Sequence, residues 1–322
     1  MRQLEINQLK LPLARPFIIS RGRRDAVDVV RVSIEENGFV GWGECTPTAH
    51  YQESVSSVIE QIEQLREPLT QGLSRAQLQK QLVKGAARNA LDCALWRLEA
   101  QQQGQSLCQY ANVAEPATLI TAQTLSLASL EEMRQSARVA LASGANLLKI
   151  KLDAHQVLDK VAAIRAEAPD ATLIIDANEA WGSLSLPNLF DRLTEYNIAM
   201  IEQPLMAGSD QSLASFDHLI PVCADESCHD SNDIVALADR YEMVNIKLDK
   251  CGGLSEALMM LETAKACQMR VMVGCMLGSS MAMEAALPVA IQAELVDLDG
   301  PLWLAADSAP HLCYRTGHIE LQ

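Results

Sequence analysis

The sequence has few aromatic residues and few histidines, and it lacks the motifs of several common protein classes. Aromatic residues make up 4% of the 322 positions, and there are six histidines. No apolar run reaches the ~18 residues that a membrane span requires. The absence of CxxC pairs disfavours a zinc site, and the absence of GxGxxG and GxxxxGK[ST] motifs disfavours a phosphate-binding loop.

The charge balance and the cysteines narrow the class further. Acidic residues outnumber basic ones by 41 to 26, for a net charge of −15, which disfavours binding to nucleic acid through a general electrostatic field. The nine cysteines are scattered and odd in number, so we expect reduced thiols. The opening segment MRQLEINQLKLPLARPF lacks the apolar stretch of a signal peptide. We therefore expect a cytoplasmic protein that binds neither membranes nor nucleic acid.

The chain divides into two patterns. Short strands are expected at residues 3–13, 27–35 and 39–42, followed by helices, which together form an α+β unit. From about residue 118, eight apolar strand-like runs alternate with amphipathic helices. This alternation predicts an α/β fold, a (β/α)₈ barrel of the TIM type over residues 116–302. A doubly wound open sheet is the alternative, because alternation alone does not fix closure of the sheet.

Two lysines end the second strand-like run of the predicted barrel, in the segment LLKIK. Side chains alternate across a strand, so Lys149 and Lys151 point one way and Leu148 and Ile150 the other. In a barrel the aliphatic pair faces the helices and the lysines face the interior. Two buried ammonium groups are costly without anions nearby, so the pattern calls for acidic partners.

Carboxylates end the next three strands. Asp176, Glu202 and Asp225 each follow an apolar run, and successive steps from Lys151 are 25, 26 and 23 residues. We expect these three strand-end carboxylates to converge at the C-terminal rim, where barrel enzymes carry their sites. Crowded carboxylates repel one another and require a cation. Oxygen ligands without His or Cys favour one Mg²⁺ ion per subunit over zinc.

Another lysine ends the sixth strand. Lys247 follows Asp225 by 22 residues, so it should lie across the mouth from the second-strand lysines. One lysine on each side of a metal-bound substrate is the arrangement needed to move a proton between the two faces of a carbon. Partial burial and nearby positive charge are expected to lower the lysine pKa values toward that of a working base. Mg²⁺ would stabilise the enediolate formed next to a carboxylate.

These motifs resemble the enolase superfamily, in its muconate-lactonizing-enzyme-like branch. The likeness covers the KxK pair, the DAN, EQP and ADES segments, KLDKCGG, and the segments GWGE and ARNALDCALW of a capping domain. It implies a capping domain over residues 1–115, completed by the tail 303–322. It also implies acid–base roles for Lys151 and Lys247, substrate-carboxylate neutralisation by Lys149, and Mg²⁺ ligation by the three strand-end carboxylates. Branch members with a His–Asp base are disfavoured, because no histidine ends the seventh strand.

The eighth strand ends in a DxD motif. Asp297 and Asp299 point the same way, into the mouth, opposite the proposed metal ligands, where they could bind a substrate ammonium. A DxD at this position resembles the dipeptide epimerases, above all the L-Ala-D/L-Glu type, which implies a role in the metabolism of peptidoglycan peptides. The expected substrate is a dipeptide with a free amino end, whose C-terminal residue is inverted at its α-carbon. Thr124, at the end of the first strand, resembles a substrate-binding position.

Three arginines, Arg21, Arg23 and Arg24, lie in the segment IISRGRRD, and one of them could pair with a glutamate side chain of the substrate. Two other functions stay open at this point. A cycloisomerase or o-succinylbenzoate-synthase-like activity is disfavoured because the DxD would repel an anionic acid. A non-catalytic binding protein is disfavoured because the lysines and carboxylates are all present. The sequence leaves the oligomeric state open, with a homo-oligomer possible.

Overall fold

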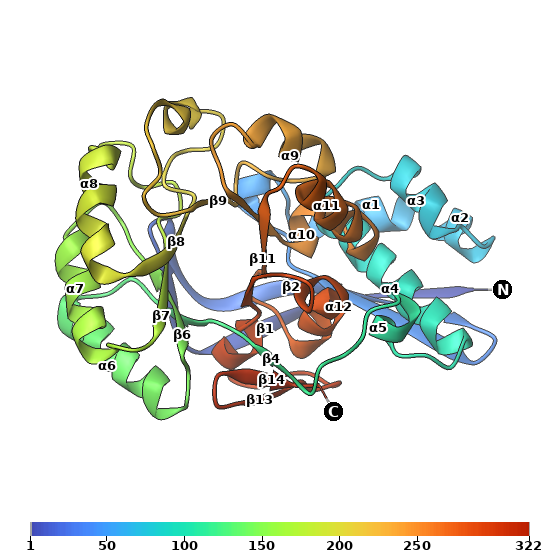
Figure 1. Cartoon of the computed structure of the whole chain (residues 1–322). Coiled ribbons are helices and arrows are strands. Elements are labelled where there is room, and N and C mark those ends of the chain that lie inside the picture. The colour runs from blue at the N-terminus through green and yellow to red at the C-terminus, as the bar shows by residue number, and fades with distance from the viewer. Residues whose placement is uncertain (1, 322) are drawn as a thin grey trace.

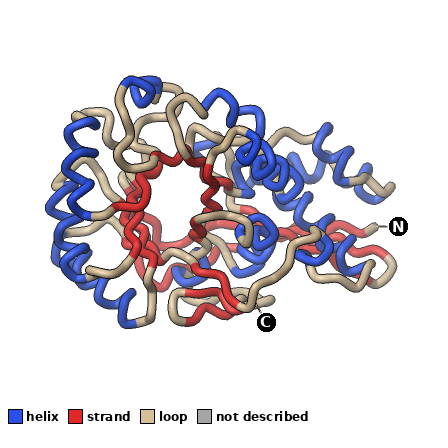
Figure 2. The backbone as a smooth tube through the Cα atoms, in the orientation of Figure 1, coloured by secondary structure: helices blue, strands red, loops and turns tan. Residues whose placement is uncertain are grey.

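The computed structural model describes residues 2–321, which form an N-terminal antiparallel sheet with helices and a ring of parallel strands enclosed by helices. Figure 1 shows the N-terminal sheet running beside the ring, and Figure 2 shows the strands of the ring encircling one centre with helices outside. No helix within residues 2–321 has the length and apolar character needed to cross a membrane. All nine cysteines are free thiols, as expected.

The N-terminal sheet consists of β1 (Gln3–Ile19), β2 (Gly22–Glu36) and β3 (Phe39–Cys45), paired antiparallel in that order. Strand β3 lies against helix α4 (Ala86–Gln102), and its glycines allow this approach. A Cβ atom at Gly41 would lie 2.0 Å from the Ala94 carbonyl oxygen, and one at Gly43 would lie 2.1 Å from that of Ala90. The remaining helices of this part are η1 (Ala49–Tyr51), α1 (Val55–Gln64), α2 (Arg66–Thr70), α3 (Arg75–Gln81) and α5 (Leu107–Tyr110).

The predicted barrel is confirmed as an eight-stranded parallel sheet whose strands follow one another in chain order. The Ala122 amide donates to the Val296 carbonyl over 2.7 Å, which joins the last strand to the segment before the first. The sheet is therefore nearly closed, and the open-sheet alternative is wrong. The strands are β5 (Gln123–Leu125), β6 (Leu147–Lys151), β7 (Thr172–Asp176), β8 (Ile198–Glu202), β9 (Val222–Ala224), β10 (Met243–Ile246), β11 (Arg270–Gly274) and β12 (Leu295–Asp297).

The helices of the barrel follow the predicted alternation with one exception. Ser129 and Glu132 form a capping box at the start of the first helix, whose C-terminal end is followed by Gly144 at φ 89°. Between β8 and β9 the polar segment carries the short 3₁₀ helix η3 (Gln211–Ser215) and no α-helix. The α-helices are α6 (Leu130–Ala142), α7 (Val157–Glu167), α8 (Leu186–Leu193), α9 (Ser231–Leu237), α10 (Leu248–Cys251), α11 (Leu254–Ala266) and α12 (Ser280–Ala290), and η2 (Thr194–Tyr196) follows α8.

The tail touches both parts of the molecule. After η4 (Gly300–Trp303), Leu304 pairs with Leu13 of β1, and the Ala305 amide donates to the Pro12 carbonyl over 2.9 Å. The last strands, β13 (Cys313–Arg315) and β14 (His318–Glu320), pair with β4 (Thr118–Ile120), which precedes the barrel. The first strand-like run, which begins at residue 118, is thus two strands in two different sheets. The domain bounds stay a prediction.

Buried apolar side chains fill the middle of the barrel and separate its two ends. A compact cluster, which includes Ile174, Met200, Met243 and Met272, fills the inside of the ring, and a larger core lies between the strands and the helices. The buried charged side chains of the ring therefore gather beyond this cluster, at the C-terminal ends of the strands. The turn between β1 and β2 reaches that end, where Ser20 Oγ donates to the Asn178 carbonyl over 3.2 Å.

Candidate active site

The second-strand lysines lie where the alternation predicts. Leu148 and Ile150 belong to the core between strands and helices, while Lys149 and Lys151 line a cavity at the barrel mouth. Lys149 is 1% exposed and meets three carboxylates, of which Asp297 accepts its hydrogen bond over 2.8 Å. Both lysines therefore have the acidic partners that their burial requires.

The three strand-end carboxylates lie on three neighbouring strands and are buried. In the sheet register, Asp176 of β7 lies beside Glu202 of β8 and beside Lys151 of β6. The Lys151 ammonium also donates a hydrogen bond to the Asp176 carboxylate. Asp225 follows β9 by one residue and is 1% exposed, while the other two are 0% exposed. The regular spacing of β/α units thus brings together acids that are about 25 residues apart in the sequence.

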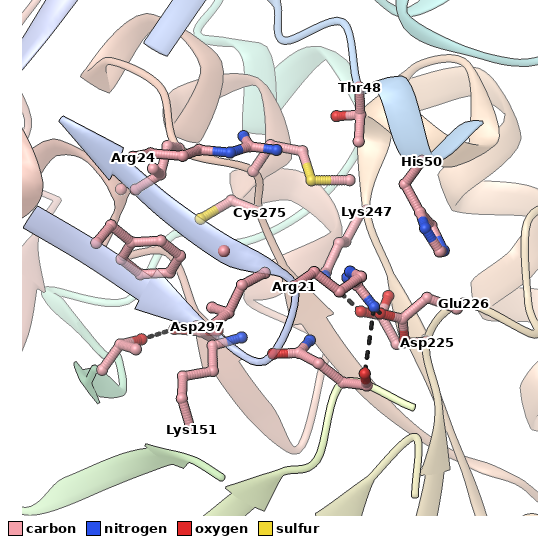
Figure 3. Close-up of a pocket in the computed structure, with 18 of the residues that line it drawn as sticks. Arg21, Arg24, Thr48, His50, Lys151, Asp225, Glu226, Lys247, Cys275 and Asp297 are labelled. Atoms are coloured by element: carbon pink, nitrogen blue, oxygen red, sulfur yellow. Dashed lines mark hydrogen bonds and ion pairs between the residues drawn. The ribbon is translucent and has the colours of Figure 1, made fainter. Parts of the chain in front are cut away.

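Lys247 lies across the barrel from Lys151. Lys151 ends β6 and Lys247 follows β10 directly, and these strands are four positions apart in the ring of eight. The carboxylates occupy the three strands between them. Figure 3 shows Lys151 and Lys247 reaching the same pocket from separate parts of the barrel. A carbon atom held at the centre of the mouth would have one lysine on each side.

Ammonium groups lie between the three strand-end carboxylates in this structure. Lys149 Nζ lies 3.2 Å from Asp176 Oδ2 and 2.6 Å from Glu202 Oε2. Lys247 Nζ lies 2.5 Å from Asp225 Oδ2 and 3.9 Å from Glu202 Oε1. Each pair of neighbouring acids therefore already shares a cation. Three buried carboxylates without His or Cys form a set of ligands that fits Mg²⁺. The ammonium groups of Lys149 and Lys247 must move away from these carboxylates when the ion binds.

The carboxylates are also more widely spaced than the ligands of one ion. Within residues 2–321, the His, Cys, Asp or Glu groups whose ligand atoms all lie within 4.8 Å of one another are His50, Glu179 and Glu226. The two acids of that group already have Arg21 as a counter-ion, because Arg21 Nη1 lies 3.1 Å from Glu179 Oε2 and 2.7 Å from Glu226 Oε1. The three strand-end carboxylates must therefore approach one another to bind one ion.

The charges of the site shift the pKa values of its members. Burial opposes the ionisation of Asp176, yet the charges of Lys151 and Lys149 outweigh it and lower the pKa. Burial and the charge of Asp176 raise the pKa of Glu202 to about 7. The expectation that the pKa of Lys247 is lowered is wrong for this structure. Burial is the largest single influence and lowers it, but the carboxylates of Asp225, 2.5 Å away, and of Glu202 together outweigh burial, so the pKa is raised.

The DxD carboxylates face the proposed metal ligands. Asp297 ends β12, which is four strands from β8 in the ring, so it lies opposite Glu202. Thr124, in neighbouring β5, donates to both acids: its hydroxyl to Asp297 over 3.5 Å and its amide to Asp299 over 2.7 Å. The two acids differ in one respect that the pattern did not predict, because Asp297 is paired with Lys149 and Asp299 has no ion pair among residues 2–321.

The mouth encloses a cavity of about 470 Å³, lined by both lysines of the second strand, Lys247, Thr124 and both DxD acids. Arg24 lines it too, and Figure 3 shows Arg24 at the pocket in the part where Cys275 lies. The Arg24 guanidinium has no hydrogen bond or ion pair with any residue of 2–321, and partial burial together with the charge of Arg21 lowers its pKa. Arg23, which also lines the cavity, instead pairs with Asp25 over 2.8 Å. Arg24 is therefore the arginine of this segment that is free to bind an anion in the cavity.

Several buried groups that support the site were not singled out from the sequence. Lys250 donates to Asp225 Oδ1 over 2.6 Å, and Asn245 donates to Glu202 Oε1 over 2.8 Å. Lys250 stands in the KLDKCGG segment, so its place one helical turn after Lys247 was a usable signal. Arg21 reaches Glu226 from the β1–β2 turn, and Figure 3 shows this guanidinium directed at the loop that carries Asp225. No sequence pattern indicates that contact.

Two family models match the chain. The model described as "Mandelate racemase / muconate lactonizing enzyme, N-terminal domain" matches residues 1–110. The model described as "Enolase C-terminal domain-like" matches residues 132–320. The two matches together cover the N-terminal sheet with its helices and nearly the whole barrel.

Curated relatives and solved structures resemble the chain over nearly its full length. An "L-Ala-D/L-Glu epimerase" of Escherichia coli (strain K12) is 49% identical over 100% of both chains. An "N-acetyl-D-glutamate racemase" of Pseudoalteromonas sp. is 40% identical over 91% of this chain and 92% of its own. A dipeptide epimerase from Methylococcus capsulatus, solved as a complex with Mg and the dipeptide L-Arg-D-Lys, is 30% identical, with a TM-score of 0.92 over 99% of this chain and 96% of its own.

Proposed function

The chain belongs to the mandelate racemase / muconate lactonizing enzyme family of the enolase superfamily, and we propose that it is a Mg²⁺-dependent dipeptide epimerase of the L-Ala-D/L-Glu type. It is an isomerase that acts on amino acid derivatives. One observation carries the assignment of its residues. Lysines on β6 and next to β10 face each other across the mouth, and the acids of β7–β9 face those of β12.

This crossed arrangement orients a dipeptide in one way. The substrate ammonium lies at the DxD acids, where charge attracts it, and the C-terminal carboxylate lies at the side of Lys149 and the three strand-end carboxylates. The α-carbon of the C-terminal residue then lies between Lys151 and Lys247. The DxD acids would repel the anionic acids that a cycloisomerase or o-succinylbenzoate synthase uses, so those activities are disfavoured.

The chemical step is a proton transfer across that carbon. One of the two lysines removes the α-proton as a free amine, and the other, as an ammonium, returns a proton to the opposite face. When bound, Mg²⁺ supplies the positive charge that offsets the three strand-end carboxylates and stabilises the enediolate oxygens. Lys149 adds its charge on the same side. The paired lysines thus account for inversion in both directions.

Preference for glutamate follows from Arg24. Its guanidinium lines the cavity and has no acidic partner among residues 2–321, so a carboxylate on the substrate side chain would provide one. The same reasoning excludes Arg23, whose guanidinium already pairs with Asp25. We propose that the enzyme is cytoplasmic, which is consistent with its epimerase relatives, and that it acts in the metabolism of peptidoglycan peptides, because a relative 49% identical to it is an L-Ala-D/L-Glu epimerase.

The test is direct. The purified protein with Mg²⁺ and L-Ala-L-Glu is expected to form L-Ala-D-Glu until both are present in nearly equal amounts, as measured by chiral chromatography. The reaction should stop when the ion is chelated and resume when it is restored. A protein that binds the dipeptide but leaves its configuration unchanged with Mg²⁺ present would contradict the proposal.

A further inference from the structure

Trp303, in the short helix η4 after the last barrel strand, lies behind the DxD motif. It is 2% exposed and does not line the cavity. Its indole nitrogen Nε1 donates a hydrogen bond to Asp299 Oδ2 over 3.2 Å. A buried carboxylate needs donors to remain ionised, and an indole N–H can only donate. Trp303 is therefore the donor and Asp299 the acceptor in this contact, and the hydrogen bond fixes the position of the Asp299 carboxylate.

The two oxygens of Asp299 have different surroundings. Oδ2 accepts from the Trp303 indole and also from the Thr124 amide at 2.7 Å. Oδ1 accepts no hydrogen bond from any residue of 2–321, although Asp299 lines the cavity. Two donors from different elements, β5 and η4, thus fix the orientation of one oxygen. The other oxygen remains free to accept a hydrogen bond from a group inside the cavity.

The opposite side of Trp303 packs on the N-terminal sheet. Phe17 of β1 meets the indole edge to face, with ring centroids 4.7 Å apart, and the Arg15 guanidinium lies 4.3 Å from the ring centre. Phe17 itself lines the cavity. Trp303 therefore lies between strand β1 and Asp299. Through Trp303, the position of β1 determines the position of an acid of the barrel.

We propose that Trp303 is a positioning residue for recognition of the substrate amino group. By holding Asp299 Oδ2 against the Thr124 amide, it directs Oδ1 at the ammonium of the dipeptide, and it makes this subsite depend on the docking of β1. The inference rests on the proposed function, since it needs a substrate with a free amino end. Trp303 touches no reacting atom, so it contributes to binding and not to proton transfer.

The test is a double-mutant cycle on substrate binding. Trp303→Phe keeps a ring against Phe17 and removes the N–H. It is expected to raise KM for L-Ala-L-Glu about tenfold and to change kcat less than about twofold, because the lost bond acts on a charged acceptor. In an Asp299→Asn background, the same change is expected to raise KM less than about twofold. If Trp303→Phe raises KM in the wild-type protein but hardly changes it in the Asp299→Asn variant, the two side chains are coupled, and Trp303 acts through Asp299.

Trp42→Phe is the matched control, because the Trp42 indole nitrogen is buried and has no hydrogen-bond partner. It should leave KM and kcat unchanged. Trp303→Phe with wild-type KM, or with an undiminished effect in the Asp299→Asn background, would overturn the inference. A drop in kcat and thermal stability without a rise in KM would overturn it too, in favour of a packing role. If wild-type protein failed to epimerise the dipeptide at all, the proposed function would fail instead.

Discussion

The two DxD acids differ at the level of single residues, because Asp297 has Lys149 as a counter-ion and Asp299 has none among the described residues. Burial and the neighbouring charge of Asp297 raise the pKa of Asp299 from its ordinary value near 4 to about 6. Its carboxylate form binds ammonium and its protonated form does not. Asp299 should therefore contribute its negative charge to the amino-end subsite above this pKa and lose that charge below it.

This shift predicts the pH dependence of substrate binding. KM for L-Ala-L-Glu should be nearly constant from pH 8 to pH 7 and rise toward about tenfold per unit once the pH falls below about 6. Steady-state kinetics across this range measures it. Asp299→Asn should raise KM at pH 8 and remove the inflection near 6. An inflection that persists unchanged in this variant belongs to another group.

Substrate side-chain preference tests the role of Arg24. Arg24→Met should lower kcat/KM for L-Ala-L-Glu by about tenfold or more, because a charge-assisted pair with the glutamate carboxylate is lost. It should lower kcat/KM for L-Ala-L-Leu far less. The measurement is the ratio of kcat/KM for L-Ala-L-Glu to kcat/KM for L-Ala-L-Leu, determined for the wild-type protein and for the variant.

Arg23→Met is the control for Arg24→Met. Arg23 carries the same charge one residue away and is also exposed, but its guanidinium already pairs with Asp25. Its loss should leave the ratio between the two dipeptides within about twofold, since an exposed pair of this kind contributes little. Equal losses in both variants would mean that the charge of the whole segment matters, and not a contact made by Arg24.

At the scale of elements, the close contact of β3 with α4 fixes the N-terminal sheet. Gly41→Ala would place a methyl group 2.0 Å from the Ala94 carbonyl oxygen, and neither backbone can yield without moving a helix. We expect a loss of about 3 kcal/mol in the free energy of unfolding. Chemical unfolding followed by circular dichroism measures it. Gly182→Ala, where a Cβ meets nothing within 4 Å, should change stability by less than about 1 kcal/mol. Equal stability of the two variants would contradict this account.

The arrangement of the barrel strands was largely predictable from the sequence, whereas the packing of the short connecting segments was not. Alternating side chains and β/α steps of 22–26 residues were enough to place the lysines and carboxylates around one mouth, because each parallel strand ends at the same rim. The contacts from Trp303 to Asp299 and from Arg21 to Glu226 were not predictable. They depend on how η4 and the β1–β2 turn pack, and no periodicity encodes the packing of such short segments.

At the scale of the whole barrel mouth, the pKa values of the lysines could not be predicted from the sequence, because they depend on the balance of all nearby charges. The lysines were expected to have lowered pKa values, yet Lys247 is ion-paired and its pKa is raised. Burial and the charge of Lys149 lower the pKa of Lys247, and the neighbouring carboxylates of Asp225 and Glu202 together raise it more. Which effect dominates depends on ångström distances, and spacing along a sequence does not determine those.

The whole molecule should be more stable with its metal ion. Mg²⁺ at saturating concentration is expected to raise the thermal midpoint by about 2 to 5 °C, since binding to the folded state adds to its stability. Differential scanning calorimetry with and without a chelator measures the change. Asp176→Asn should abolish the gain without abolishing folding. A gain that survives in this variant would place the ion elsewhere.

The central claim is that Lys151 and Lys247 each serve one face of the same α-carbon. Proton NMR in D₂O with Mg²⁺ tests it most directly, by following the α-hydrogen of L-Ala-L-Glu and of L-Ala-D-Glu separately. Lys151→Ala and Lys247→Ala should each slow epimerisation by about 10³-fold or more. One variant should still exchange the α-hydrogen of the L,L isomer, and the other that of the L,D isomer. Epimerisation retained in both variants, or exchange of the same isomer by both, would contradict the account.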